Sequence, residues 1–189
     1  VLDNVRSDKN IIAMSKTGSG KTHAFLLPIF NDLVEEEKSC QAVIVAPTLE
    51  LARQIYKVAQ HIASFSPNTI TVKAYYGGTD MEREMEKIKS NPPQIVVATP
   101  GKLVDLAIDE NILKIHLAKY FVMDEADMIA DSFLEDVFKI SEKFKEAKKM
   151  VFSATIRESL EPLLRKFLSN TITLEVEKKD VSSLKIEHF

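Results

Sequence analysis

The sequence has little cysteine, no excess of either charge and no long apolar run, and each shortage excludes a class of protein. Its one cysteine, Cys40, cannot form an internal disulfide bond, so we expect a buried, small apolar side chain in a protein of the reducing cytoplasm. No apolar run approaches the ~20 residues that cross a bilayer, so we expect no transmembrane helix and no membrane partner. The 25 Lys and Arg against 28 Asp and Glu give a net charge of −3, so bulk charge gives no indication of nucleic-acid binding.

The length of 189 residues suits one domain with a substantial core. The first residue is Val1 rather than methionine, so we expect the chain to be a piece of a longer protein. The polar stretch 177–189 predicts an exit from a domain that spans 1–176, and without a long apolar surface run we expect that domain to be a monomer.

Short apolar runs alternate with stretches of helical periodicity along the whole chain. The runs are rich in Val and Ile and mostly continuous, as in strands that are covered on both faces. Strand and helix in repeated alternation predict an α/β fold, an open, mostly parallel, doubly wound sheet of about seven strands with helices on both faces. The predicted strands are Ile11–Met14, Ala42–Ala46, Thr71–Tyr76, Ile95–Ala98, Tyr120–Met123, Met150–Phe152 and Thr171–Val176.

Three of the predicted helices are marked by the 3.6-residue spacing of their apolar residues or by a capping signal. Thr79 and Glu82 have the spacing of a capping box and predict the start of one helix. The apolar faces of the other two are formed by Leu51, Ile55, Val58 and Ile62, and by Ile156, Leu160, Leu163, Leu164 and Phe167.

A glycine-containing segment, SKTGSGKT, follows the first predicted strand and leads into a helix. Glycine lets the backbone wrap closely around phosphates, and the amides at a helix start attract anions. Lys21 adds a point charge for the phosphates and the Thr22 hydroxyl can ligate Mg²⁺. A strict phosphate-loop pattern has glycine where this chain has Ser15, and a plain glycine-rich turn with an exposed lysine is the alternative. The predicted nucleotide-binding residues are Ser15, Lys16, Thr17, Gly18, Ser19, Gly20, Lys21 and Thr22.

A second segment, the acidic Asp124–Asp127, directly follows the fifth predicted strand. Mg²⁺ is usually held by one or two carboxylates together with the phosphates, and Asp124 fits that role. Glu125 is placed to act as base or orienter for a water that attacks the γ-phosphate. The alternative is a solvated acidic turn. Together with the phosphate loop, the segment predicts an ATP and Mg²⁺ site with Lys21, Asp124 and Glu125 as catalytic residues.

With these segments the sequence resembles the DEAD-box RNA helicases, whose name describes the four residues Asp124–Asp127. Further segments match the family in order over almost the whole chain. They are SKTGSGKT, then PTLELA at Pro47–Ala52, the pair Gly77–Gly78, TPGK at Thr99–Lys102 and SAT at Ser153–Thr155. The resemblance implies the first RecA-like core domain of such a helicase.

The resemblance also implies a role for residues outside the ATP site. Asp127 would form hydrogen bonds with the segment Ser153, Ala154 and Thr155 and so couple the nucleotide site to the rest of the protein. Threonines at helix starts and exposed glycine amides can donate to phosphates, so RNA would be bound through its backbone and independently of sequence. Helix capping is an alternative, compatible role. The implied RNA-binding residues are Pro47, Thr48, Gly77, Gly78, Thr99, Pro100, Gly101 and Lys102.

The chain departs from the family's usual pattern at three further places. Leu49 and Lys102 stand where arginines are usual, and Ile156-Arg157 replaces the common Met-Pro after SAT. Lysine keeps the charge but loses the two-pronged hydrogen bonding of arginine. We therefore expect RNA binding that is weaker or more sensitive to salt than in relatives.

The resemblance implies two parts that this chain lacks, an adenine-reading Q motif before Val1 and a second RecA-like domain with its arginines. The domain alone is therefore expected to be nearly inactive, whereas the whole protein would use ATP hydrolysis to unwind or remodel short RNA duplexes. The alternatives are a DNA-directed translocase of the same superfamily, a non-catalytic ATP-dependent RNA clamp, and a protein-interaction scaffold that has lost the chemistry.

Overall fold

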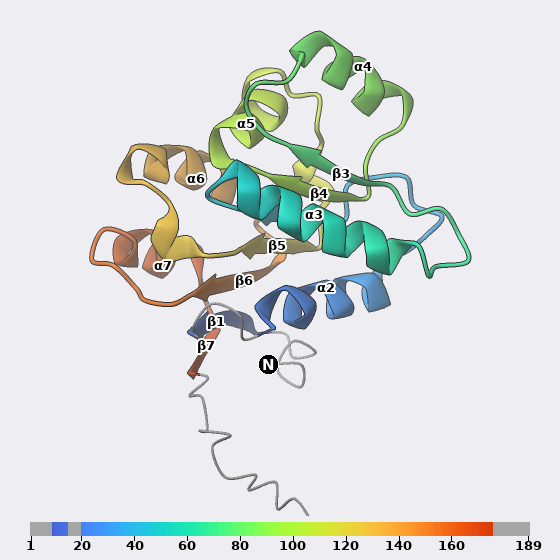
Figure 1. Cartoon of the computed structure of the whole chain (residues 1–189). Coiled ribbons are helices and arrows are strands. Elements are labelled where there is room, and N and C mark those ends of the chain that lie inside the picture. The colour runs from blue at the N-terminus through green and yellow to red at the C-terminus, as the bar shows by residue number, and fades with distance from the viewer. Residues whose placement is uncertain (1–8, 15–19, 176–189) are drawn as a thin grey trace, which may run out of the picture.

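Seven strands form one sheet in the computed structural model, which describes residues 9–14 and 20–175 (Figure 1). The strand order is β3-β4-β2-β5-β6-β1-β7, and every pairing between the described strands is parallel. The predicted fold class is confirmed, with a sheet that is parallel throughout. The strands are β1 (Asn10–Met14), β2 (Ala42–Val45), β3 (Val72–Tyr75), β4 (Ile95–Ala98), β5 (Tyr120–Met123), β6 (Lys148–Ser153) and β7 (Thr171–Glu175).

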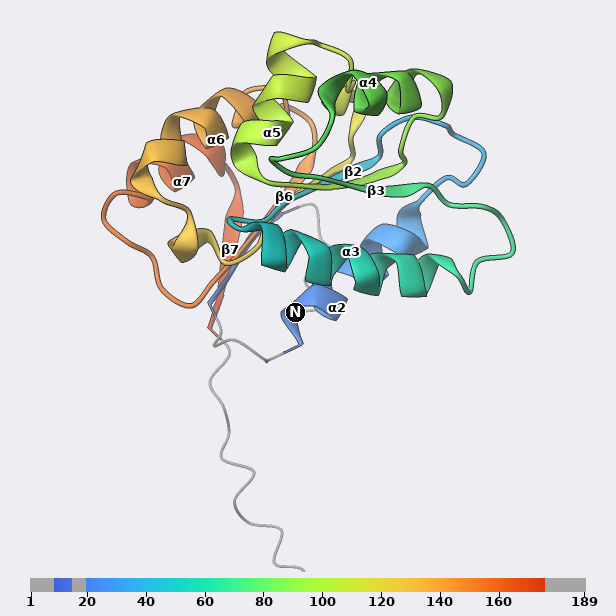
Figure 2. The same cartoon turned by 45° about the horizontal axis from the view of Figure 1, so that its top comes forward.

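Helices cover both faces of the sheet, which explains why the strands are apolar without alternation (Figure 2). Strands β2, β4 and β5 are buried along their whole length. No described helix is long and apolar enough to cross a membrane. One face carries α2 (Lys21–Asp32) and α3 (Leu49–Ala63), and the other carries α4 (Met81–Ser90), α5 (Pro100–Val104), α6 (Leu134–Ser141) and α7 (Glu161–Phe167).

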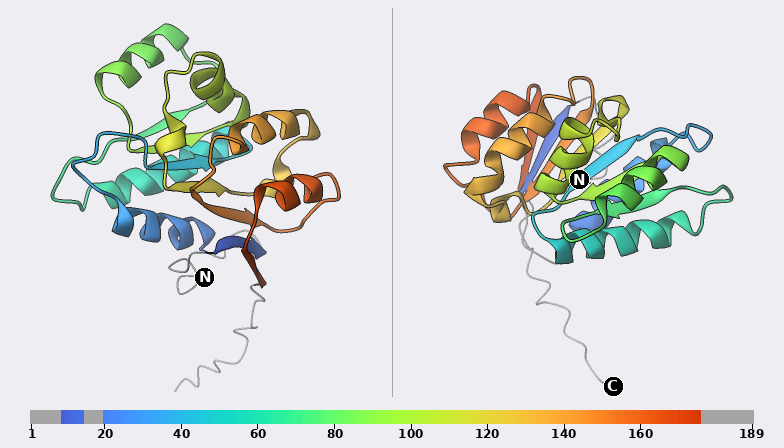
Figure 3. Two further views of the ribbon diagram at one scale, coloured as in Figure 1. Left: turned by 180° about the vertical axis from the view of Figure 1, so that it is seen from behind. Right: turned by 90° about the horizontal axis from the view of Figure 1, so that it is seen from above.

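The first strand lies far from its chain neighbours, between the last two strands of the sheet (Figure 3). Ile11 pairs with Met150 of β6 on one side and with Ile172 of β7 on the other. This end of the sheet is therefore built from segments that are distant in sequence, with β7 as the edge strand.

The predicted start of α4 is wrong by one residue. Asp80, not Thr79, caps the helix, because its carboxylate accepts a hydrogen bond from the Arg83 amide at 3.2 Å. The Thr79 hydroxyl instead donates to the Tyr76 carbonyl oxygen at 3.0 Å and closes the turn after β3. The expected pairing of Thr79 with Glu82 therefore does not form, since the turn uses the threonine and leaves the cap to its neighbour.

The last predicted helix is shorter than its apolar pattern suggests. Helix α7 begins at Glu161, with Pro162 in its first turn, where proline costs no hydrogen bond. Ile156 lies before the helix and is 37% exposed. It therefore does not extend the apolar face of the helix that Leu164 and Phe167 bury.

Cys40 is buried, as expected for a small apolar side chain. Burial raises the pKa of its thiol to about 12, and the hydrogen bond to the Ala42 carbonyl oxygen only partly opposes this. The thiolate is the reactive form of cysteine, so this thiol is inert in the folded domain.

Two buried glutamines fix the connection between α2 and β2 to the amino edge of the sheet. Gln94 donates from Nε2 to the carbonyl oxygens of Glu35 (2.9 Å) and Glu37 (3.1 Å), while its Oε1 accepts from the Thr71 amide (3.0 Å). Gln41 likewise donates to the Glu37 carbonyl at 3.0 Å. The side chains thus replace backbone partners that this loop lacks.

Replacing Gln94 by leucine is expected to lower the free energy of unfolding by about 2–3 kcal/mol, because the Thr71 amide and the loop carbonyls lose their partners. Urea denaturation measures the loss. The matched control is Gln54→Leu on the exposed side of α3, which should change stability by less than about 0.5 kcal/mol. Equal effects of the two substitutions would contradict the clamping role of Gln94.

Candidate nucleotide and RNA site

The segments singled out in the sequence all follow strands at the carboxyl edge of the sheet, where open α/β sheets bind ligands. The order of the strands in the sheet divides these segments into two groups, although the members of the two groups are mixed along the chain. The predicted nucleotide and coupling segments follow the adjacent strands β5, β6 and β1, and the predicted RNA segments follow the adjacent strands β3, β4 and β2. The structure thus brings the candidate residues together as two neighbouring groups. We call the segments after β5, β6 and β1 the nucleotide half-site and those after β3, β4 and β2 the RNA half-site.

The end of the phosphate loop leads directly into α2. Gly20 has a φ of +83°, in the left-handed region that glycine adopts without strain, and Lys21 and Thr22 form the start of the helix. Helix starts present free amides to anions. The remaining predicted residues of the loop, Ser15, Lys16, Thr17, Gly18 and Ser19, lie outside the described residues.

Lys21 and Glu125 form a buried ion pair across the nucleotide half-site. Their Nζ and Oε1 atoms are 2.8 Å apart, and each side chain is 7% exposed. Glu125 has a φ of +47°, which is uncommon for a residue with a Cβ atom. This conformation turns the chain sharply at the end of β5 and directs the Glu125 carboxylate to the start of α2.

Asp124 lies beside this pair and is also buried. The pKa of its carboxyl group is raised to about 6, first by burial and then by the charge of Glu125, and the charge of Lys21 and the Glu125 amide oppose this rise. That amide donates to Asp124 Oδ1 at 3.0 Å. Among the described residues of this half-site, two buried carboxylates against one ammonium leave an excess of negative charge, which a divalent cation would stabilise.

The donors present fit Mg²⁺ better than a transition metal. Asp124 and Thr22 supply oxygen atoms, which Mg²⁺ prefers. Within residues 9–14 and 20–175, no group of three His, Cys, Asp or Glu side chains forms a metal site by itself. A Mg²⁺ ion at this place would therefore take its other ligands from phosphates and water.

Asp127 is bonded to the segment that follows β6. Its carboxylate accepts from the Thr155 amide and hydroxyl, each at 3.2 Å, and from the Ala154 amide at 3.4 Å. The Ser153 hydroxyl oxygen accepts from the Asp127 amide at 3.0 Å. Burial raises the pKa of Asp127, but the bonds from Ser153 and its neighbours outweigh this and hold it below the ordinary value. The contact implied by the resemblance exists, whereas its coupling role stays a prediction.

A family model described as DEAD/DEAH box helicase matches residues 1–163 of the chain. The chain belongs to the DEAD/DEAH box helicase family. Among its relatives, the DEAD-box ATP-dependent RNA helicase CshB of Listeria monocytogenes is 43% identical over 190 residues, which cover 100% of this chain and 43% of that protein. The ATP-dependent RNA helicase eIF4A of Debaryomyces hansenii is 35% identical, over 98% of this chain and 46% of that protein.

Solved structures of the family share this fold. A DEAD box protein from Methanococcus jannaschii superposes with a TM-score of 0.80 at 31% identity, over 89% of this chain and 46% of that one. A hypothetical ATP-dependent RNA helicase from Sulfolobus tokodaii gives 0.81 at 29% identity, over 93% of this chain and 50% of that one. The chain thus spans less than half the length of the curated relatives named above.

Two of the predicted RNA segments of this DEAD-box domain differ in how they use their polar groups. Thr48 caps α3, since its hydroxyl accepts from the Leu51 amide at 3.3 Å. Gly77 and Gly78 are exposed, and Gly78 has a φ of +86°, so a side chain there would be strained. Capping therefore occupies Thr48, while Gly77 and Gly78 lie exposed to solvent.

The third segment starts α5 without a side-chain cap. The Thr99 hydroxyl makes no capping bond, although its amide donates to the Tyr75 carbonyl oxygen at 3.1 Å. Pro100 is buried at the first helical position, and a Cβ atom at Gly101 would lie 3.8 Å from the Phe133 ring. The capping alternative thus fits Thr48 and not Thr99, whose hydroxyl is available to a ligand.

Lys102 is placed differently from the other predicted RNA-binding residues. It is buried, and its Nζ lies 2.7 Å from Oε2 of Glu84 on α4. Sequence analysis missed Glu84, because nothing local in the sequence links two helices that are separated by a strand. A phosphate-binding lysine is expected at an exposed position, whereas Lys102 is buried against Glu84.

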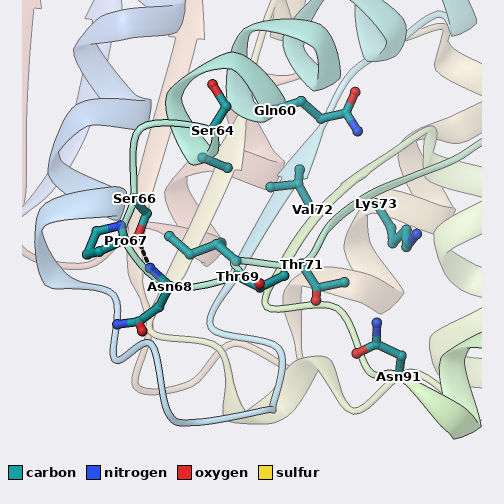
Figure 4. Close-up of a pocket in the computed structure, with 12 residues that line it drawn as sticks. Gln60, Ser64, Ser66, Pro67, Asn68, Thr69, Thr71, Val72, Lys73 and Asn91 are labelled. Atoms are coloured by element: carbon teal, nitrogen blue, oxygen red, sulfur yellow. Dashed lines mark hydrogen bonds between the residues drawn. The ribbon is translucent and has the colours of Figure 1, made fainter.

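A hollow of about 500 Å³ lies away from this edge, at the end of α3 and the start of β3 (Figure 4). Its walls include Ser64, Asn68, Thr71 and Lys73, and none of its residues belongs to the segments described above. Since it opens at the other end of β3 from Gly77, it is separate from the candidate site.

Proposed function

We propose that this chain is the first core domain of an ATP-dependent RNA helicase, which couples ATP hydrolysis to local unwinding or remodelling of RNA. One observation carries the proposal. The nucleotide segments and the RNA segments occupy adjacent halves of one sheet edge, and Asp127 joins the segments after β5 and β6 by hydrogen bonds. The names of the relatives, ATP-dependent RNA helicases, agree with it.

In this proposal the nucleotide half-site binds ATP together with Mg²⁺. The amides of the phosphate loop and the Lys21 ammonium hold the phosphates, and Thr22 and Asp124 hold Mg²⁺, partly through water. The bound ion supplies positive charge that neutralises the phosphates. Because phosphate competes with Glu125 for Lys21, nucleotide binding releases the Glu125 carboxylate, which then orients and deprotonates the attacking water.

The RNA half-site binds the sugar–phosphate chain in the proposed function. The exposed amides of Gly77 and Gly78, the uncapped Thr99 and the start of α3 at Thr48 supply donors without net positive charge. Such contacts read no bases, so binding is independent of sequence. Pro47, Pro100 and Gly101 shape these turns.

The remaining parts of the machine belong to the whole protein, which we place in the cytoplasm. Residues 1–176 form the first RecA-like domain, 177–189 begin the linker, and a second RecA-like domain supplies arginines across the cleft. Arginines of this kind are worth ~10³–10⁵ in rate, so the first domain alone, a monomer, hydrolyses almost no ATP.

The test is ATP hydrolysis by the full-length protein with RNA, with DNA and with neither, with Glu125→Gln as the inactive control. Stimulation by RNA alone that the substitution abolishes is the expected result. Equal stimulation by DNA would indicate a translocase instead. Nucleotide binding without hydrolysis would indicate a clamp, and the loss of both would indicate a scaffold.

A further inference from the structure

The largely buried pair Lys102–Glu84 joins the first turn of α5 to the first turn of α4. The two side chains are 6% and 14% exposed, and their charged atoms are 2.7 Å apart. The Lys102 ammonium also lies 3.3 Å from the Met81 sulfur. The Glu84 oxygen receives the ammonium at ion-pair distance without hydrogen-bond alignment, so the contact is electrostatic.

This pair leaves Lys102 unsuited to bind an RNA phosphate. To reach a ligand in solvent, its ammonium would have to leave Glu84 as an uncompensated carboxylate in a largely buried place. Separating one member of a buried ion pair is strongly unfavourable. Glu84 also acts on Tyr75, since the pKa of that phenol is raised first by burial and then by the charge of Glu84.

Helix α4 depends on this contact because few of its other side chains are buried. Of its ten residues only Ile88 is buried, and Met81 and Met85 are partly buried against the core. Its cap, Asp80, lies two residues after Gly78. Its first turn, which Glu84 anchors, therefore determines where the glycine loop lies.

Lys102, the other member of the pair, fixes the segment that begins at Thr99. Lys102 lies in the turn that Thr99 begins, and β3 and β4 pair in register at Tyr75 and Ala98. The Thr99 amide already bonds to the Tyr75 carbonyl oxygen. The ion pair thus adds a second connection between the segments after β3 and β4, since it links α4 to α5.

We propose that Lys102 is a positioning residue that acts on RNA through Glu84, by holding the Gly77–Gly78 loop and Thr99 in one arrangement, and does not itself touch RNA. The inference rests on the proposed function, in which these two segments bind the RNA backbone. It replaces the expectation that Lys102 contributes a phosphate contact.

The decisive variant is Glu84→Gln, because positioning and direct contact predict changes of opposite sign. If Lys102 bound phosphate, removing its buried partner would free the ammonium and tighten RNA binding. If Lys102 positions the loops, the same change loosens α4 and weakens RNA binding. The RNA concentration for half-maximal stimulation of ATP hydrolysis by the full-length protein is expected to rise about fivefold or more in Glu84→Gln.

Lys102→Met is expected to raise that RNA concentration by a similar factor, with the turnover at saturating RNA and the KM for ATP within about twofold of the unsubstituted protein. The salt dependence provides a second distinction. Loss of a phosphate contact reduces the slope of log Kd against log salt by about 1, whereas loss of positioning leaves the slope unchanged. Lys87→Met, on the exposed side of α4, is the matched control and should leave the half-maximal RNA concentration unchanged.

Hydrogen exchange of the full-length protein without RNA tests the structural step alone. Amides of α4 and of Gly77–Gly78 should exchange faster in Glu84→Gln and Lys102→Met, while those of α3 do not change. Tighter RNA binding in Glu84→Gln, a reduced salt slope in Lys102→Met, or unchanged exchange in α4 would overturn the proposal. If RNA fails to stimulate even the unsubstituted protein, the proposed function is wrong, and so is the role of Lys102 in RNA binding. Hydrogen exchange would still show separately whether the Lys102–Glu84 pair holds α4 in place.

Discussion

Replacing Glu125 by glutamine is expected to lower the RNA-stimulated rate of ATP hydrolysis by about 10²–10⁴-fold, the usual contribution of a positioned general base. Glutamine has nearly the same shape but accepts no proton, so the attacking water loses its base. The same change removes the negative partner that holds Lys21 at 2.8 Å. Because that negative charge would repel the phosphates, ATP should bind at least as tightly as before.

Hydrolysis rates and ATP titrations of the full-length protein measure the two effects separately. Glu110→Gln, at an exposed position, is the matched control and should behave as the unsubstituted protein. Lys21→Met should instead weaken ATP binding. If Glu125→Gln weakened ATP binding as much as it slowed hydrolysis, Glu125 would belong to the binding site and not to the chemical step.

Replacing Asp127 by alanine is expected to reduce the stimulation of ATP hydrolysis by RNA by about tenfold or more, within the 1–3 kcal/mol typical of coupling between two sites. The substitution removes the carboxylate bonds to the amides of Ala154 and Thr155 and to the Thr155 hydroxyl. Since Ala154 and Thr155 are exposed, water can replace these bonds, so stability changes little. Movement of the segment after β5 then no longer displaces the segment after β6.

The measurement compares ATP hydrolysis with and without saturating RNA, together with ATP affinity in the absence of RNA. Only the stimulated rate should fall in Asp127→Ala. Asp109→Ala, an exposed aspartate outside the site, is the control. An equal loss of ATP affinity without RNA would show that Asp127 supports the nucleotide site itself and would exclude a purely coupling role.

The strands and the edge that carries the site could be predicted from the sequence because both depend on local patterns. Continuous apolar runs are buried on both faces of a parallel sheet, and each run matches an observed strand to within two residues at either end. The chain also has only five glycines, and all of them lie in the segments after β1, β3 and β4. Short loops that need left-handed or unhindered backbone are therefore visible in the sequence.

The side-chain partners could not be predicted, because they depend on which loops the sheet places next to each other. The Lys21–Glu125 pair joins segments after β1 and β5, and Lys102–Glu84 joins two helices. The sequence also does not show which of two neighbouring residues will cap a helix. Thr79 and Asp80 are both good helix caps, and only the turn after β3 decides that Asp80 takes the role.

The place of β1 between β6 and β7 has a consequence for how the domain folds during synthesis. Within this domain, the strand that leads into the phosphate loop is made before the other strands, yet its partners, Met150 and Ile172, lie in the last two strands to be made. Long-range parallel pairing of this kind is slow and leaves strand edges open in partly made chains. A nascent chain that ends before Lys148 has strands β2 to β5 available to pair but no neighbour for β1. The surface after β2, β3 and β4 can therefore take shape while the nucleotide pocket is still unformed.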